Sequence, residues 1–145
     1  MEVYTAGFTH TTAEAFFGTL RRVGIKRLLD VRLNNVSQLA GFSKRDDLRY
    51  FLRELCAAED LHEPLLAPTQ ELLDEYRKAK GSWETYERRF LALMREREIE
   101  RRIDRGLFAV PTVLLCSEAT AEHCHRRLVA EYLRDAWGDL TITHL

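Results

Sequence analysis

Reactive side chains gather in one short stretch of the sequence, residues 113–133. This stretch reads VLLCSEATAEHCHRRLVAEYL and contains two of the three cysteines and two of the five histidines of the chain. A cysteine thiolate is a nucleophile, a histidine gives or takes protons near neutral pH, and both bind soft metal ions. We therefore expect the functional site here. Its candidate residues are Cys116, Glu118, Cys124, His125 and Arg126.

The predicted elements explain why this stretch suits a site. Thr112 to Cys116 is the clearest buried strand, and a helix capped by Thr120 and running to about Trp137 is expected to follow. Ligands of open parallel sheets bind beyond the carboxyl ends of the strands. The first turn of a helix also offers free N–H groups and a positive dipole end, which attract anions and lower the pKa of nearby thiols. The pattern favours a small anionic substrate, with Arg126 among the residues that bind it.

Helical geometry separates the residues that the predicted first turn contains. At 100° per residue, the apolar stripe comprises Ala121, Leu128, Val129, Tyr132 and Ala136. His125 lies in the middle of this stripe and Cys124 at its edge, so both are expected to face the sheet, where Cys116 ends. His123 and Arg126 are expected to point elsewhere.

Three interpretations of this stretch remain open. In the first, Cys116 or Cys124 is a catalytic nucleophile, a histidine is its base, and Glu118 and Arg126 complete the site. In the second, Cys116, Glu118, Cys124 and His125 hold a zinc or iron ion, although the spacing matches no standard zinc motif. In the third, the cysteines and histidine are buried structural residues.

Other strand ends supply candidate partners. Asp30 and Arg32 flank Val31 at the end of a strand predicted over residues 25–31 and share one face of it. Asp30 would orient a base or bind a metal and Arg32 would bind the substrate anion, or the two form an ion pair that closes the strand. Thr5 and Gly7 end a first strand and are further candidate substrate-binding residues, Gly7 because it permits close approach or a turn.

The order of predicted elements indicates an α/β fold. Strands are expected at 2–6, 25–31, 61–62, 112–116 and 140–144, and they alternate with helices capped by Thr11, Ser43, Thr69, Ser82 and Thr120. Alternation predicts a single domain over residues 1–145, with a mostly parallel sheet of four or five strands between helices. Residues 69–105 form an extra helical segment.

Composition narrows the function classes. The formal net charge is -1, from 22 basic and 23 acidic residues, which counts against a strongly nucleic-acid-binding surface. A non-catalytic module that binds nucleic acid or protein through the Arg-rich residues 88–105, Arg126 and Arg127 remains the alternative to an enzyme. We expect no membrane span and no signal peptide, and hence reduced thiols and a cytoplasmic location.

Three stretches resemble a known family. They are YTAGFT at 4–9, LLDVR at 28–32 and LLCSEATAEHCHRRLVAEYL at 114–133, and they are similar to the bacterial and archaeal domain-of-unknown-function family 488. The family's T-x-G-x-[ST], D-V-R, C-x-E and C-H-R motifs fall on Thr5, Gly7, Thr9, Asp30, Val31, Arg32, Cys116, Glu118, Cys124, His125 and Arg126. The resemblance implies the same site residues and no particular reaction. Phe8 stands where many members have a histidine.

A more distant similarity links the chain to rhodanese-like domains, which also have D-V-R at a strand end and a cysteine at a strand-to-helix turn. Here Cys116 stands ten positions before Arg126, so the tight loop between cysteine and helix is missing. Glu118 lies between them, and an acid beside a thiolate opposes persulfide chemistry. We treat this similarity as an analogy only.

Overall fold

A five-stranded parallel sheet forms the centre of the protein. The computed structural model describes residues 1–34, 41–117 and 122–145. The strands are β1 (Glu2–Gly7), β2 (Arg27–Asp30), β3 (Glu59–His62), β4 (Thr112–Cys116) and β5 (Thr141–His144), in the order β3-β2-β4-β1-β5. All four pairings are parallel, so the predicted α/β fold and its mostly parallel sheet are confirmed. The carboxyl ends of all five strands therefore lie along one edge.

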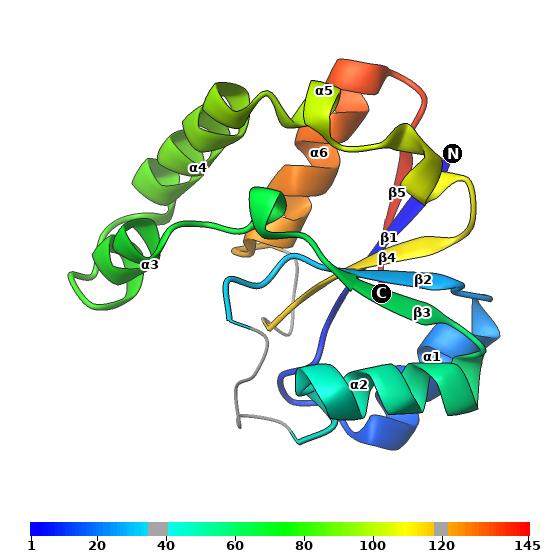
Figure 1. Ribbon diagram of the computed structural model, residues 1–145. Coiled ribbons are helices and arrows are strands. Elements are labelled where there is room, and N and C mark those ends of the chain that lie inside the picture. The colour runs from blue at the N-terminus through cyan, green and yellow to red at the C-terminus, as the bar shows by residue number, and fades with distance from the viewer. Residues whose placement is uncertain (35–40, 118–121) are drawn as a thin grey trace.

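Helices cover both faces of this sheet (Figure 1). One face carries α1 (Ala13–Arg22) and α2 (Arg45–Phe51), followed by a π-helical turn at Leu52–Cys56. The other face carries α3 (Gln70–Arg77), α4 (Trp83–Arg97), α5 (Ile99–Arg102) and α6 (His125–Trp137). The predicted helical segment at 69–105 corresponds to α3, α4 and α5. In the part of the chain that the structure describes, no helix is both long and apolar enough to cross a membrane.

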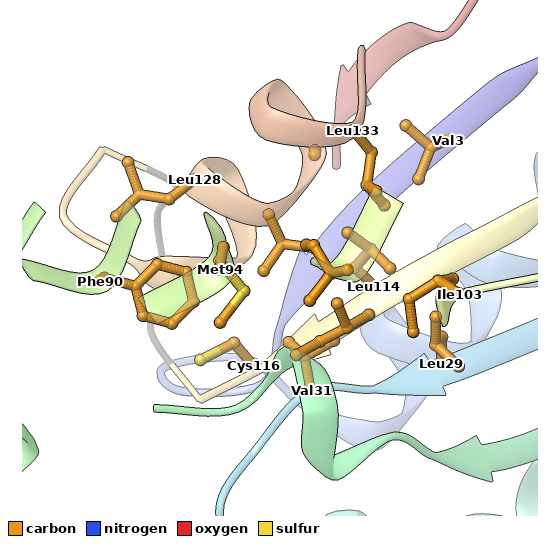
Figure 2. Packing of buried hydrophobic residues seen from close by; sticks show 14 of the residues in the cluster. Val3, Leu29, Val31, Phe90, Met94, Ile103, Leu114, Cys116, Leu128 and Leu133 are labelled. Carbon is orange, nitrogen blue, oxygen red and sulfur yellow. The ribbon is translucent and has the colours of Figure 1, made fainter. Parts of the chain in front are cut away.

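The central strand β4 determines the direction of the Cys116 side chain. All five of its residues are buried, and successive side chains enter opposite cores. Leu114 and Cys116 join the core beneath α4 and α6, whereas Val113 and Leu115 join the core beneath α1 and α2. Figure 2 shows the Cys116 side chain near Phe90 and Met94 of α4. The period of two therefore turns Cys116 toward α6.

Two of the predicted helix caps are confirmed and two are wrong. The hydroxyls of Thr69 and Ser82 accept hydrogen bonds from the first turns of α3 and α4, as expected. Helix α1 is capped by Thr12 and not by Thr11. Thr12 is the residue directly before the helix, has extended backbone, and its side chain accepts a hydrogen bond from the Ala15 N–H. Ser43 is buried in a 3-10 turn, and Lys44 precedes α2 without a side-chain cap.

The start of α6 also differs from the prediction. The helix begins at His125, and Cys124 precedes it with extended backbone, at φ -138° and ψ 139°. Cys124 is thus the N-cap residue and not part of the first turn. Thr120 and Ala121, predicted as the cap and as part of the apolar stripe, lie outside the described residues. At its other end the helix stops at Gly138, whose φ of 82° suits glycine.

Candidate functional site

Three reactive side chains meet at the carboxyl edge of the sheet. Cys116 ends β4, and Cys124 and His125 begin α6. One ligand atom from each of the three lies within 4.8 Å of the other two, and all three residues are buried. The predicted convergence of Cys116, Cys124 and His125 is therefore present in the structure.

The imidazole of His125 bridges two strand ends. Its Nε2 atom lies 2.7 Å from the carbonyl oxygen of Val31, which follows β2. A carbonyl oxygen only accepts hydrogen bonds, so Nε2 carries a proton and donates it. The Nδ1 atom is then the free ring nitrogen nearer to Cys116, whose Sγ atom lies 3.4 Å from Nδ1 and 3.8 Å from Nε2. The ring of Phe90, with its centroid 5.5 Å from that of His125, covers the imidazole.

The close contact separates the proton affinities of the three groups. Burial by itself would raise the pKa of the Cys116 thiol, but a hydrogen bond from Cys124 and the positive charge of His125 hold it well below its usual range. Burial by itself would lower the pKa of His125, but the negative charge of Cys116 and the hydrogen bonds to Cys116 and to the Val31 carbonyl together raise that pKa. The hydrogen bond to Cys116 raises the pKa of Cys124, and burial adds to this. The site therefore favours a Cys116 thiolate, a His125 imidazolium and a neutral Cys124 thiol.

A pocket of about 270 Å³ opens beside Cys116 and His125. Its size is near the lower end of small-molecule sites. The cationic side chains of Arg32 and Arg77 line it, and no acidic side chain does so among the residues that the structure describes. The other lining residues are Phe8, Leu33, Asn34, Pro68, Gln70, Leu73 and Ser117. The pocket therefore places the Cys116 sulfur beside two arginine side chains.

Arg77, the last residue of α3, was missed by the sequence reasoning. It is exposed, lines the pocket, and lies close enough to His125 for its charge to act against protonation of that histidine. No local motif distinguishes Arg77 from the other arginines of the helical segment. The only available signal was that α3 follows β3 and so begins near the carboxyl edge of the sheet.

Asp30 and Arg32 form a buried ion pair. The guanidinium of Arg32 donates to both carboxylate oxygens of Asp30, at 2.9 and 2.8 Å, and to the carbonyl oxygen of Ser43 at 2.7 Å. The carboxylate of Asp30 is thus engaged by Arg32, and the carbonyl of Val31 orients His125 instead. Arg32 still lines the pocket, and its Nη1 atom has no hydrogen-bond partner among the described residues.

Arg126, predicted to point away from the apolar stripe that faces the sheet, is fully buried. It contacts the sheet after all, because β1 lies beneath the start of α6 and its Thr5 side chain reaches the guanidinium. The Nε atom of Arg126 donates to the hydroxyl of Thr5 at 3.3 Å, and its Nη1 atom lies 4.0 Å from Cys124 Sγ. Arg126 is not among the described residues that line the pocket. Its guanidinium places a positive charge beside Cys124.

Two further predicted site residues lie on or beyond the strand ends. Gly7 ends β1 directly opposite Cys116 in the parallel register. Glu118 lies outside the described residues. His123, expected to be peripheral, is exposed and stacks on Trp83 with a centroid separation of 4.9 Å. The cluster of Cys116, Cys124 and His125 supplies three ligand atoms that could hold a soft cation such as zinc, which usually takes four.

Neither the remaining cysteine nor the arginine side chains of residues 88–105 line the pocket. Cys56 is buried in the opposite core, with its Sγ atom 3.6 Å from the carbonyl oxygen of Phe17. Burial raises the pKa of this thiol. The arginines of the segment are largely engaged: Arg97 binds backbone carbonyls, and Arg101 and Arg105 pair with acidic side chains.

Comparison with known proteins gives one match. No curated protein and no solved structure matches the chain. The family model described as "Domain of unknown function DUF488" matches residues 12–133, which include Asp30, Arg32, Cys116, Cys124 and His125. Thr5 and Gly7 precede the matched region. Because the match covers most of the sequence and agrees with the resemblance seen in its motifs, the chain belongs to the DUF488 family.

Proposed function

We propose that this protein is an enzyme that uses the Cys116 thiolate as a nucleophile on a small anionic substrate. The observation that carries the proposal is the contact between Cys116 Sγ and His125 Nδ1 at 3.4 Å, in a ring held by the Val31 carbonyl at 2.7 Å. A nucleophile beside a histidine that a third group orients is the usual arrangement for covalent catalysis by cysteine. The pocket beside them gives a substrate access to the sulfur.

Each group has a defined part in this chemistry. The substrate binds in the 270 Å³ pocket, where Arg77 and Arg32 attract its negative charge. The Cys116 thiolate attacks the electrophilic atom, and the bond to the leaving group breaks. The imidazolium of His125 gives its Nδ1 proton to the leaving group and becomes neutral. The Nε2–H bond to Val31 keeps the ring in place during the transfer.

Paired alkylating agents test this proposal. Iodoacetate and iodoacetamide have similar size and reactivity, but only iodoacetate is an anion. In the reduced wild-type protein we expect Cys116 to be alkylated first. The alkylation rate with iodoacetate, divided by the rate with iodoacetamide, should be higher at Cys116 than at Cys56. Mass spectrometry of the digested protein gives both rates. The variant Arg77→Met should lower the ratio about tenfold, the size of one well-placed charge interaction.

A matched control completes the design. Arg101→Met removes an exposed arginine that pairs with Glu98, far from the pocket lining, and should leave the ratio unchanged. Equal alkylation of all three cysteines, or a ratio that Arg77→Met does not alter, would contradict the proposal.

Metal binding is a second candidate, favoured by the three ligand atoms within 4.8 Å. Elemental analysis of the purified protein separates the two candidates. A stoichiometric zinc or iron ion whose removal by a chelator exposes Cys116 to alkylation would favour the metal site. Reactive thiols without metal would favour the nucleophile. Both candidates require reduced cysteines, and we therefore propose a cytoplasmic location.

A further inference from the structure

The second cysteine of the site, Cys124, donates a hydrogen bond to Cys116 but forms no bond to the substrate in a single nucleophilic attack. Its Sγ atom lies within 4.8 Å of Cys116 Sγ, and both residues are buried. A disulfide needs an S–S distance of about 2.05 Å, so a small movement joins the two sulfurs. Cys124 is the N-cap residue of α6, and its carbonyl oxygen accepts a hydrogen bond from the Arg127 N–H at 3.2 Å, so the movement comes from rotation of its side chain and not from its backbone.

The two sulfurs differ in their access to the pocket. Cys116 lines the 270 Å³ pocket, whereas Cys124 is not among the described residues that do so. Cys124 instead lines an adjoining crevice of about 10 Å³, which shares Cys116 and His125 with the pocket. That crevice is too small for more than one water molecule. A substrate in the pocket therefore meets Cys116 first, and Cys124 approaches Cys116 from the adjoining crevice.

We propose that Cys124 is the resolving thiol of this site and that the substrate is a small anionic disulfide, which the protein reduces. The inference rests on the proposed function, because it needs Cys116 as the nucleophile. A second thiol beside the first is productive for a sulfur electrophile, since its attack releases the bound half of the substrate. With an acyl substrate, the same attack would only move the acyl group from one thiol to the other.

The reaction balances in two steps. Cys116 attacks one sulfur of R–S–S–R′, forming Cys116–S–S–R, and R′–S⁻ takes the Nδ1 proton of His125 and leaves as R′–SH. Neutral His125 then takes the proton of Cys124, and the Cys124 thiolate attacks the Cys116 sulfur. The second half leaves as R–SH with that proton. The substrate gains two electrons and two protons, and Cys116 and Cys124 become a disulfide.

A small thiol returns the protein to its starting state. Two molecules of R″–SH reduce the Cys116–Cys124 disulfide, giving back the two thiols and forming R″–S–S–R″. Arg32 and Arg77 line the pocket, and in the described part of the chain no acidic side chain does. This lining favours disulfides that carry carboxylates or similar groups.

The probe for the test is dithiobis(nitrobenzoate), an aromatic disulfide with two carboxylates. In single-turnover reactions with reduced protein, we expect the site to release two thionitrobenzoate ions per chain. No thionitrobenzoate should remain bound to Cys116 as a mixed disulfide. Peptide mapping should find a Cys116–Cys124 disulfide. In Cys124→Ser, one ion is released and a stable mixed disulfide stays on Cys116. Any release of a second ion from Cys124→Ser should be on the order of 100-fold slower than in wild type, because wild type holds the resolving thiol in place beside the mixed disulfide.

Cys56 provides the matched control. It is equally buried but belongs to the opposite core, so Cys56→Ser should form the same disulfide at the same rate. A wild-type mixed disulfide that persists on Cys116 would overturn the inference while leaving the proposed nucleophile intact. No modification of Cys116 in any variant would overturn both. These measurements use wild type, Cys124→Ser and Cys56→Ser, so they do not depend on whether Cys116→Ser folds.

Discussion

The imidazole of His125 donates from Nε2 to the carbonyl oxygen of Val31, 2.7 Å away. This bond joins the first residue of α6 to the residue after β2, which are 94 positions apart in the sequence. It fixes which ring nitrogen faces Cys116, because only Nδ1 remains for the sulfur. The acid–base character of the site thus depends on a backbone carbonyl from a different strand.

Removing His125 should slow the reaction of Cys116 at low pH. In wild type the lowered pKa of Cys116 keeps its thiolate present well below the usual thiol range. In His125→Asn the pKa rises, and even an ordinary thiol, with a pKa near 8.5, is only about 1% ionised at pH 6.5. We expect the iodoacetamide rate at Cys116 to fall by at least about tenfold at that pH, and by less at pH 9.

His123→Asn is the control for this measurement. His123 is the neighbouring exposed histidine and stacks on Trp83, so its loss should leave the pH profile of Cys116 in place. The same pH profile in His125→Asn and in wild type would show that His125 does not stabilise the thiolate.

The buried ion pair of Asp30 and Arg32 should be essential to folding. Asp30 is 2% and Arg32 5% exposed, so Asp30→Asn leaves a buried guanidinium without its counter-charge. We expect a loss of about 3–5 kcal/mol in the free energy of unfolding, measured by urea denaturation. Glu59 of β3 forms an ion pair with Arg27 of β2, and the Glu59 side chain is half exposed. Glu59→Gln breaks this pair and should lower the free energy of unfolding by only about 0–1 kcal/mol. Equal losses in the two variants would refute this ranking.

Thr5 should stabilise the buried Arg126. Its hydroxyl accepts from Arg126 Nε at 3.3 Å and shares a hydrogen bond with His144 Nδ1 at 2.6 Å. Thr5→Val keeps the shape but removes the acceptor, and we expect a loss of about 1–3 kcal/mol in thermal or urea unfolding. Thr143→Val changes an exposed residue of β5 and should stay within about 0.5 kcal/mol of wild type. A neutral Thr5→Val would show that this hydroxyl is dispensable.

Arg97 should fix the segment that leads from β3 to α3. Its Nη1 atom donates to the carbonyl oxygens of Leu65 and Ala67, both at 2.7 Å. In Arg97→Ala these charged hydrogen bonds are lost, and we expect about 1.5–3 kcal/mol less stability together with faster amide exchange around Leu65. Arg101→Ala removes an exposed arginine of α5 and should change stability by less than about 0.5 kcal/mol. If amide exchange at Leu65 is unchanged in Arg97→Ala, these bonds do not hold the segment.

Patterns with a short period were sufficient to predict the sheet and most of the site. The buried run Thr112–Cys116 placed Cys116 at a strand end, and the alternation of strands and helices predicted that such ends share one edge. The local spacing of Cys124 and His125 then brought both toward Cys116. These features depend on neighbouring residues and on the fixed geometry of strands and helices, which a sequence displays directly.

The tertiary structure decided what those patterns cannot encode. The sheet extends to β1 beneath the start of α6, so Arg126 is buried against Thr5 on a side of the helix that helical phase had placed away from the apolar stripe. The Val31 carbonyl orients His125, and Arg77 reaches the pocket from α3, although both are distant in sequence. A backbone carbonyl is present at every position, so the sequence does not mark the one that binds a side chain. An exposed arginine near a pocket has the same local sequence pattern as one elsewhere on the surface. Such contacts depend on how separate elements pack, so the sequence determined the reactive groups and only packing determined their partners.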